Sequence, residues 1–208
     1  APHTLGVPSM GVILAGMGGL IAGGAHVVSG PDHLAAVAPL AVADRWRAAV
    51  MGVLWGIGHA LGVLILGMLG QLLKGSVVVE QVSTWSELAV GALLVVLGGW
   101  TLWRTRHGAL ASHSHAHGTA LGLGFLHGTA GAGHLFAVLP SLAMSTQAAA
   151  AYLAAYMLSA VAIMALFSVG VGMVASRPGR LLVATRVAGV LAAVVGVAWM
   201  GMGLFASH

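Results

Sequence analysis

Long apolar stretches separated by short polar connections are the feature that most limits what this chain can fold into. A helix needs about 20 consecutive apolar residues to cross the hydrocarbon core of a bilayer. Only 6% of the residues are charged, whereas a soluble domain carries about 25%, so this sequence cannot supply the surface of a water-soluble globule. We therefore predict an all-α polytopic membrane protein with six spans, at about 9–43, 48–73, 88–103, 120–144, 148–175 and 181–205.

The arginines distinguish the two sides of the predicted bundle. Six of the eight basic residues fall in the first, third and fifth connections between spans, namely Arg45, Arg47, Arg104, Arg106, Arg177 and Arg180. Connections of odd number share one side of the membrane, and basic loops favour the cytoplasmic side. We predict a multi-pass protein of the cell inner membrane with both termini outside.

The two halves of the chain resemble each other when one is shifted by 101 residues. Seven of the fourteen positions from 26 to 39 are then identical. For example, His26 falls on His127, and His33 falls on His134. Each half holds three spans, and an odd number inverts the second copy in the membrane, as in many secondary transporters. The predicted organisation is a first three-span repeat at 1–104, a histidine-rich cytoplasmic loop at 105–118 and a second, inverted repeat at 119–208.

The first span is interrupted within "GAHVVSGPDHLAAVAPL", residues 24–40. Pro31 lacks an N–H and ends or kinks a continuous helix, but it suits the first position of a new helix. On an unbroken helix His26 and His33 would lie about 10 Å apart along the axis, too far to share an ion at bond lengths of about 2 Å. We therefore predict two half-helices, broken so that both histidines point at one place.

Asp32 and three further histidines complete the set of unusual residues within the spans. A carboxylate at membrane depth implies a partner or a function. Asp32 either complements the N-terminus of the second half-helix or acts at a metal site, as a ligand or by orienting the adjacent imidazole. His59, His127 and His134 are either ligands or hydrogen-bonded groups of the core or of a gate.

Other features of the sequence exclude several classes of site. There is no cysteine, so thiolate sites and disulfides are excluded, while imidazole ligands favour nickel, copper, zinc and iron(II). We expect no nucleic-acid partner, because no basic run with interleaved aromatic residues is present. No nucleotide-binding motif is present either, so any ATP coupling would need another subunit. The loop histidines either collect metal ions or belong to a polar linker; they are His107, His113, His115 and His117.

These motifs resemble those of the nickel/cobalt permease superfamily, which includes urease- and hydrogenase-accessory membrane proteins. "HVVSGPDH" at 26–33 fits the His-(x3)-Gly-x-Asp-His signature. "WGIGHALGV" looks like the second signature, an aromatic residue followed by Gly-His, on Trp55, Gly58 and His59. "LHGTAG" at 126–131 looks like the His-Gly-x-Ala stretch of the shorter members. The resemblance implies transition-metal transport, typically of nickel, with the first motif essential.

Together these observations predict a permease and not an enzyme. The expected cargo is Ni²⁺, with Co²⁺ as a second candidate, and uptake is favoured over export; no organic cofactor is expected. The candidate metal residues are His26, Asp32, His33, His59, His127 and His134. Expected partners are the cargo ion and the bilayer, with a metallochaperone or an accessory subunit as further candidates. An exporter, a membrane-embedded metalloenzyme and a factor that holds metal without moving it stay open as alternatives, as do uniport and proton-coupled transport.

Overall fold

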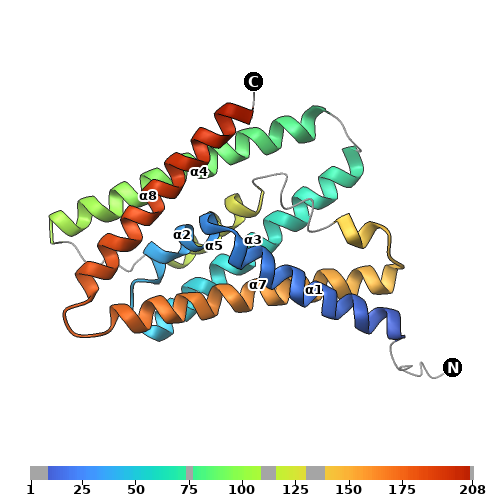
Figure 1. The fold of residues 1–208 in the computed structure, drawn as a ribbon, viewed down its shortest axis with the longest axis horizontal. Helices are drawn as coiled ribbons and strands as arrows, with labels where there is room; N and C mark the ends of the chain where they lie inside the picture. The colour runs from blue at the N-terminus through green and yellow to red at the C-terminus, as the bar shows by residue number, and fades with distance from the viewer. Residues whose placement is uncertain (1–8, 74–76, 109–115, 130–138, 207–208) are drawn as a thin grey trace.

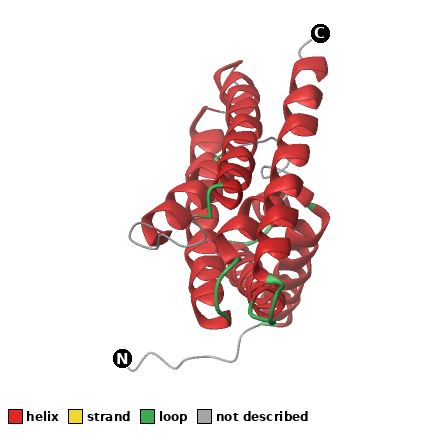
Figure 2. Ribbon diagram, turned by 90° about the vertical axis from the view of Figure 1, so that its left-hand side faces the viewer, coloured by secondary structure: helices red, strands yellow, loops and turns green. Residues whose placement is uncertain are grey.

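The computed structural model describes residues 9–73, 77–108, 116–129 and 139–206, and their regular structure is helical throughout. The helices are α1 (Met10–Ser29), α2 (Pro31–Ala41), α3 (Arg45–Leu73), α4 (Val77–Arg106), α5 (Ala116–Gly128), α7 (Thr146–Ala175) and α8 (Leu181–Ala206). Figure 2 shows how these helices gather into one bundle. The predicted all-helical fold is confirmed for this part of the chain.

Five helices contain a stretch long and apolar enough to cross a membrane: Met10–Ser29, Arg45–Leu66, Leu88–Arg106, Thr146–Ala175 and Leu181–Met202. Their outward faces are apolar too. On α7, for example, Leu158 is 67% exposed and Leu166 is 66% exposed. An extensive apolar surface of this kind is unfavourable in water and compatible with lipid. The length of these helices and the character of their surface fit a multi-pass membrane protein.

Two predicted spans differ from the helices that the structure describes. The third span was expected from about residue 88, but α4 begins at Val77, because the polar residues before 88 continue the helix beyond its apolar part. The fourth span, 120–144, overlaps α5, which begins four residues earlier, at Ala116, and has 13 residues. This helix is too short to cross a bilayer alone, since about 20 residues are needed. Residues 130–138 lie outside the described part of the chain, so a sixth complete span stays a prediction.

Three close helix pairs form the framework: α1 lies beside α7, α3 beside α5, and α4 beside α8 (Figure 1). Glycines permit the close approach in each pair. A Cβ atom on Gly23 would overlap the carbonyl oxygen of Tyr156, and one on Gly124 would overlap that of Trp55. Small residues at such contacts are typical of helix interfaces in membranes, where backbone packing replaces the hydrophobic effect.

The same glycine contacts give the directions of the paired helices. The pair α1–α7 is parallel (Gly19 with Tyr152, Gly23 with Tyr156), the pair α3–α5 is parallel (Gly124 with Trp55, Gly128 with His59), and the pair α4–α8 is antiparallel (Gly91 with Gly196, Gly98 with Gly189). A fourth contact, between α3 and α7, is antiparallel and joins the first two pairs (Gly52 with Ser168, Gly56 with Val161). The helices α1, α7, α3 and α5 are thus joined one to the next by close contacts.

The short helices α2 and α5 lie in the middle of the bundle, between the α4–α8 pair and the α1–α7 pair (Figure 1). Helix α2 contacts α3, α7 and α8. The main hydrophobic cluster surrounds it, with Val37 of α2 packed among Val27, Trp55, Leu94 and Met164. The polar residues at the start of α2 are therefore held against the apolar centre of the molecule.

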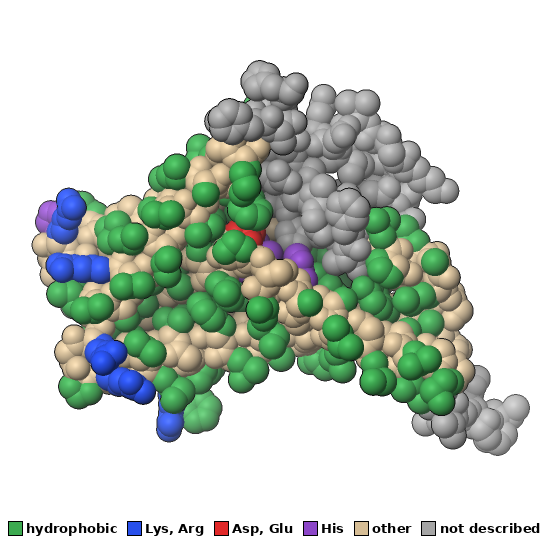
Figure 3. All heavy atoms as spheres, viewed as in Figure 1, with side chains coloured by type: hydrophobic (Ala, Val, Ile, Leu, Met, Phe, Trp, Pro, Cys, Tyr) green, Lys and Arg blue, Asp and Glu red, His purple; other side chains and the backbone are tan. Residues whose placement is uncertain are grey.

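The basic side chains gather at one end of the bundle, on the left of Figure 3. The start of α3, the end of α4 and the connection between α7 and α8 carry the six arginines singled out in the sequence. The close approach of Gly172, near the end of α7, to Arg45 and Ala48 places the ends of two of these helices together. The arginines therefore mark one end of the molecule, as the sequence predicted.

Candidate metal centre

The predicted break between His26 and His33 is present, and it consists of one residue. Gly30 ends α1 in an extended conformation, with φ −94° and ψ 94°, and α2 begins at Pro31. The Gly30 N–H donates to the carbonyl of Val27, and the His33 N–H donates to the carbonyl of Gly30 at 3.1 Å. A Cβ at residue 30 would overlap the His33 ring and approach Asp32 Oδ1 to 2.9 Å. Glycine is therefore needed because the first turn of α2 folds its side chains back over the break.

This local fold brings His26 and His33 together despite their separation along the chain. Their Nε2 atoms lie 3.0 Å apart, and their ring centroids are 4.6 Å apart in a perpendicular arrangement. His33 is buried and His26 is partly buried. The geometric reason for predicting the break, that both rings should point at one place, is confirmed.

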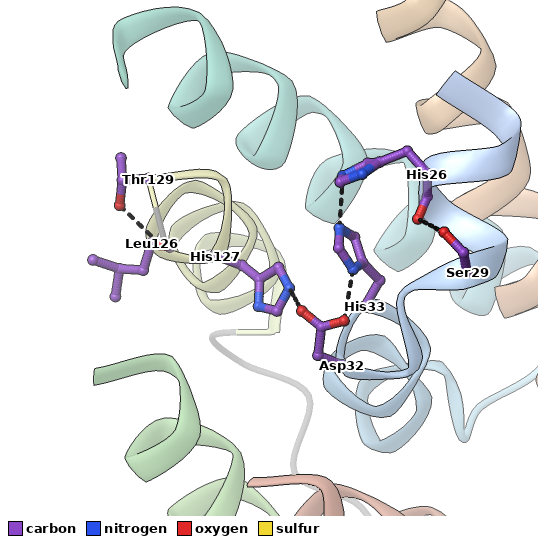
Figure 4. A network of polar contacts seen from close by, with 7 residues as sticks. All are labelled: His26, Ser29, Asp32, His33, Leu126, His127 and Thr129. Atoms are coloured by element: carbon purple, nitrogen blue, oxygen red, sulfur yellow. Dashed lines mark hydrogen bonds and ion pairs between the residues drawn. The ribbon is translucent and has the colours of Figure 1, made fainter. Parts of the chain in front are cut away.

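Asp32 contacts two imidazoles from different parts of the chain (Figure 4). Its Oδ1 accepts a hydrogen bond from His33 Nδ1 at 3.0 Å, and its Oδ2 lies 2.9 Å from Nε2 of His127. Because an ionised carboxylate is only an acceptor, His33 carries its proton on Nδ1 and presents the Nε2 lone pair to His26. Asp32 lies in the first turn of α2, where the N-cap residue, Gly30, makes no side-chain cap hydrogen bond. Both carboxylate oxygens contact imidazoles.

His127 reaches Asp32 because of the close packing of α5 on α3. It lies in the last turn of α5 and is 3% exposed. Beside it, Gly124 and Gly128 fit against the carbonyl oxygens of Trp55 and His59. Larger residues at these two glycines would push α5 away from α3 and carry His127 away from the carboxylate.

His59, in the middle of α3, closes the cluster from the other side. Its ring centroid lies 4.9 Å from that of His33 and 5.7 Å from that of His26. Trp55, one turn earlier, stacks on the His59 ring at 5.2 Å and 11°. The imidazole is 1% exposed and is held between the indole and the other histidines.

Two overlapping groups of these side chains could hold a metal ion. In the first group, His26, His33 and His59 each offer a nitrogen, and in the second, Asp32, His33 and His127 offer an oxygen and two nitrogens; within each group the ligand atoms lie within 4.8 Å of one another. His33 belongs to both. A donor set of imidazoles with one carboxylate and no thiolate suits a borderline divalent metal ion.

The structure thus brings together five of the six predicted metal residues. His134 lies outside the described residues, as do His113 and His115 of the loop, and their roles stay predictions. The two described loop histidines are remote from the cluster: His107 Nδ1 lies 2.9 Å from the Trp103 carbonyl, and His117 is exposed in the first turn of α5.

Two aromatic neighbours of the cluster were not predicted as parts of the site. Trp55 stood out in the sequence only through the second motif, and Tyr156, on α7, did not stand out at all. The ring of Tyr156 lies 5.8 Å from that of His26. The internal repeat contained a signal that relates the two residues, because the shift of 101 residues places Trp55 on Tyr156.

No family model matches the sequence, and no solved structure matches it. The chain is 46% identical over 88 residues to the chloroplast protein FOR GROWTH AND FERTILITY 2 of Arabidopsis thaliana, covering 42% of this chain and 24% of that protein. It is also 46% identical over 81 residues to FOR GROWTH AND FERTILITY 1 of the same plant, covering 38% and 22%.

A third relative is the urease accessory protein UreH of Bacillus sp. (strain TB-90), which is 32% identical over 148 residues, covering 62% of this chain and 61% of that protein. The chain spans less than a quarter of the length of the two chloroplast proteins and about three fifths of the third. These names describe an accessory protein and growth-related chloroplast proteins, and none of them names an enzyme, in agreement with the prediction of a non-enzymatic protein.

Proposed function

We propose that the protein is a membrane permease for divalent transition metal ions, with Ni²⁺ as the main cargo, Co²⁺ as a second cargo and uptake as the direction. The observation that carries this proposal is the meeting of His26, His33 and His59 at a buried point among long apolar helices. A polar cluster at membrane depth is costly and marks an ion path more often than a structural feature. The similarity to a urease accessory protein supports a nickel-related role.

The arrangement of the first two histidines fits two neighbouring positions around one ion. Metal–imidazole bonds of about 2.1 Å at right angles place the two nitrogens about 3 Å apart. The observed separation of the Nε2 atoms of His26 and His33 is 3.0 Å. In this proposal the ion displaces the proton that the two nitrogens share, and His59 supplies the third nitrogen.

Asp32 then acts mainly through His33. A carboxylate that accepts from the far nitrogen of a ligating imidazole fixes the ring and raises its basicity. Among the side chains whose exposure is described, Asp32 is the only buried carboxylate, so it also supplies negative charge against the incoming cation. His127 orients the second carboxylate oxygen, and with Asp32 and His33 it forms a second position to which the ion can pass. His134 completes or gates the path from the second half.

The helix registers support the proposed pair of inverted three-span repeats, 1–104 and 119–208. Gly23 meets Tyr156, and Gly124 meets Trp55; the two glycines are 101 residues apart, and so are the two aromatic residues. A two-fold relation between the halves requires such an exchange of partners. Rocking of one repeat against the other would open the histidine cluster to each side in turn.

The arginine-rich end is proposed to face the cytoplasm, with the protein in the inner membrane and both termini outside. This orientation follows from the bias of basic residues toward the cytoplasmic side. The 105–118 loop would then lie at the cytoplasmic end, where its histidines could collect released ions. A metallochaperone or accessory subunit would meet the protein there.

The test is nickel flux into proteoliposomes, comparing the wild type with His33→Ala and Asp32→Asn. We expect the wild type to carry Ni²⁺, His33→Ala to abolish flux, and Asp32→Asn to reduce Ni²⁺ affinity about 10-fold to 100-fold, as the loss of an outer-shell partner does. Unchanged flux in both variants would contradict the site. Binding without flux in the wild type would instead favour a factor that holds metal.

Asp44→Asn is the matched control for Asp32→Asn. Asp44 Oδ1 accepts from the backbone N–H groups of Trp46 and Arg47 at the start of α3. The hydrogen bond from Arg47 lowers the pKa of the Asp44 carboxyl, so the control also removes a negative charge at neutral pH. Asparagine serves equally well as a helix cap, so we expect this variant to fold and to carry nickel as the wild type does.

A further inference from the structure

Tyr156 lies against the proposed cargo site and has no assigned role. Its ring lies 5.8 Å from the His26 ring, tilted by 37°. Its position is set by the backbone, because its carbonyl oxygen is packed against Gly23, three residues before His26. Tyr156 is therefore held beside His26 by the same contact that joins α1 to α7.

The hydroxyl of this tyrosine is buried without a hydrogen-bond partner among the described residues. The residue as a whole is 2% exposed. Buried polar atoms are nearly always hydrogen-bonded, and an exception calls for an explanation such as a bound ion or water. The position beside His26 points to the cargo as the missing partner.

The number of ligands offered by the protein leaves room for water on the ion. His26, His33 and His59 offer three nitrogens, whereas Ni²⁺ and Co²⁺ commonly take more ligands than three and are satisfied by nitrogen and oxygen together. Water molecules on a divalent cation point their hydrogens outward. These water hydrogens need a hydrogen-bond acceptor nearby, and the phenolic oxygen of a tyrosine can accept such a bond.

Trp55, the counterpart of Tyr156 under the repeat offset, differs in this respect. Its indole Nε1 is also buried without a hydrogen-bond partner among the described residues, and its ring is 5.9 Å from that of His33. The indole N–H can only donate, so it is poorly suited to the outward hydrogens of a water ligand. The acceptor is therefore found on the Tyr156 side.

We propose that the Tyr156 hydroxyl accepts a hydrogen bond from a water ligand of the ion held by His26, His33 and His59. Tyr156 is thus a positioning residue that favours partly hydrated ions such as Ni²⁺ and Co²⁺ over Zn²⁺, which is commonly content with four ligands. This inference rests on the proposed function.

The experiment measures binding of Ni²⁺, Co²⁺ and Zn²⁺ to the purified full chain in detergent, with the wild type, Tyr156→Phe and Tyr152→Phe. For Tyr156→Phe we expect the Kd for Ni²⁺ and Co²⁺ to rise about 10-fold, with a smaller change for Zn²⁺. The melting temperature without metal should stay the same or rise, because phenylalanine removes a buried hydroxyl that has no partner among the described residues.

Tyr152→Phe is the control. Tyr152 lies one turn earlier on α7 and lines a cavity of about 340 Å³ with Ala15 and Met144. We expect its metal affinities to match the wild type. A general effect of removing a hydroxyl from α7 would appear in both variants, whereas an effect on the cargo appears only in Tyr156→Phe.

Several results would overturn the inference. The first is a Kd for Ni²⁺ that is the same in Tyr156→Phe as in the wild type. The second is an equal loss of affinity for Ni²⁺, Co²⁺ and Zn²⁺ in this variant. The third is a lower melting temperature without metal together with unchanged affinity. A tyrosinate absorption band on addition of Ni²⁺ would also overturn it, in favour of direct coordination. If the wild type itself fails to bind Ni²⁺, the proposed function fails; if it binds through His33 and Tyr156→Phe is normal, only this inference fails.

Discussion

The pairs α1–α7 and α3–α5 are built alike but carry different chemistry. Both are parallel, and in both a glycine fits against the carbonyl oxygen of an aromatic residue, Gly23 against Tyr156 and Gly124 against Trp55. The α1–α7 pair brings His26 to the cluster, and the α3–α5 pair brings His59 and His127. The common packing explains how histidines from separate helices come to lie within one cluster.

The difference lies in the segments that directly follow α1 and α5. Helix α1 leads through Gly30 into α2, where Asp32 supplies the carboxylate of one candidate metal group and His33 supplies the imidazole that both groups share. The corresponding stretch after α5 has Ala132 and Gly133 in place of Pro31 and Asp32. The comparison teaches that similar helix packing can bring polar side chains from both halves to one cluster while only one half supplies the carboxylate.

The largest expected effect tests whether the two pairs really are equivalent. Gly23→Ala and Gly124→Ala should each destabilise the protein by about 2 kcal/mol or more, because the added methyl group overlaps a main-chain oxygen and overpacking of this kind costs about 1–3 kcal/mol. Thermal unfolding in detergent, followed by tryptophan fluorescence, measures both variants. We expect similar losses in the two pairs.

Each of these variants has a control on its own helix. A Cβ on Gly16 of α1 or on Gly122 of α5 meets nothing within 4 Å. Replacement by alanine there should be neutral or stabilising, because alanine is favoured over glycine in a helix by about 1 kcal/mol. Severe damage from Gly23→Ala together with a neutral Gly124→Ala would break the proposed equivalence.

A smaller effect distinguishes the roles of the related histidines His26 and His127. If the ion rests mainly on His26, His33 and His59, then His26→Ala should weaken Ni²⁺ binding by more than 100-fold. His127→Ala removes only a partner of Asp32, and such changes typically cost about 10-fold to 100-fold. Equilibrium binding to the purified protein measures both values.

The opposite order would place the ion in the second group, with Asp32 and His127 as ligands. His117→Ala serves as a control, because this residue is also on α5 but is exposed at its start. We expect His117→Ala to bind nickel with unchanged affinity. A loss there would mean that the measurement reports metal on the surface of the molecule.

Much of the site could be predicted because its residues are conspicuous in an apolar sequence. Gly30 and Pro31 predicted the break, because a proline ends or kinks a continuous helix. The spacing of His26 and His33 indicated why a break is needed, since the two rings would lie too far apart on an unbroken helix. The structure has both features. The sequence could not show which side chains contact Asp32. His33 is its neighbour, but His127 is 95 residues away along the chain.

The place of the two aromatic residues at the cluster could not be predicted from the sequence. Trp55 and Tyr156 lie in continuous apolar helices, where an aromatic side chain is as suitable for lipid as for the core, and no periodicity separates these two faces. Their place at the histidine cluster depends on which helices pair and in which register. The polar start of α4 was also missed, because hydropathy describes the membrane-crossing part of a helix and not its whole length.

The smallest expected effect concerns the segment that joins the two halves, the 105–118 loop. Replacing His113, His115 and His117 with serine should leave the affinity of the buried site unchanged, because the described candidate ligands of that site lie on α1, α2, α3 and α5, away from the start of α5. Binding of Ni²⁺ at low metal concentration, where only the tight site fills, is the measurement. We expect the variant to lose only weak additional binding, since a histidine-rich polar sequence can collect metal without a fixed geometry. Loss of the tight site would mean that the loop belongs to it, and the comparison of the two helix pairs would then have to include the segment between them.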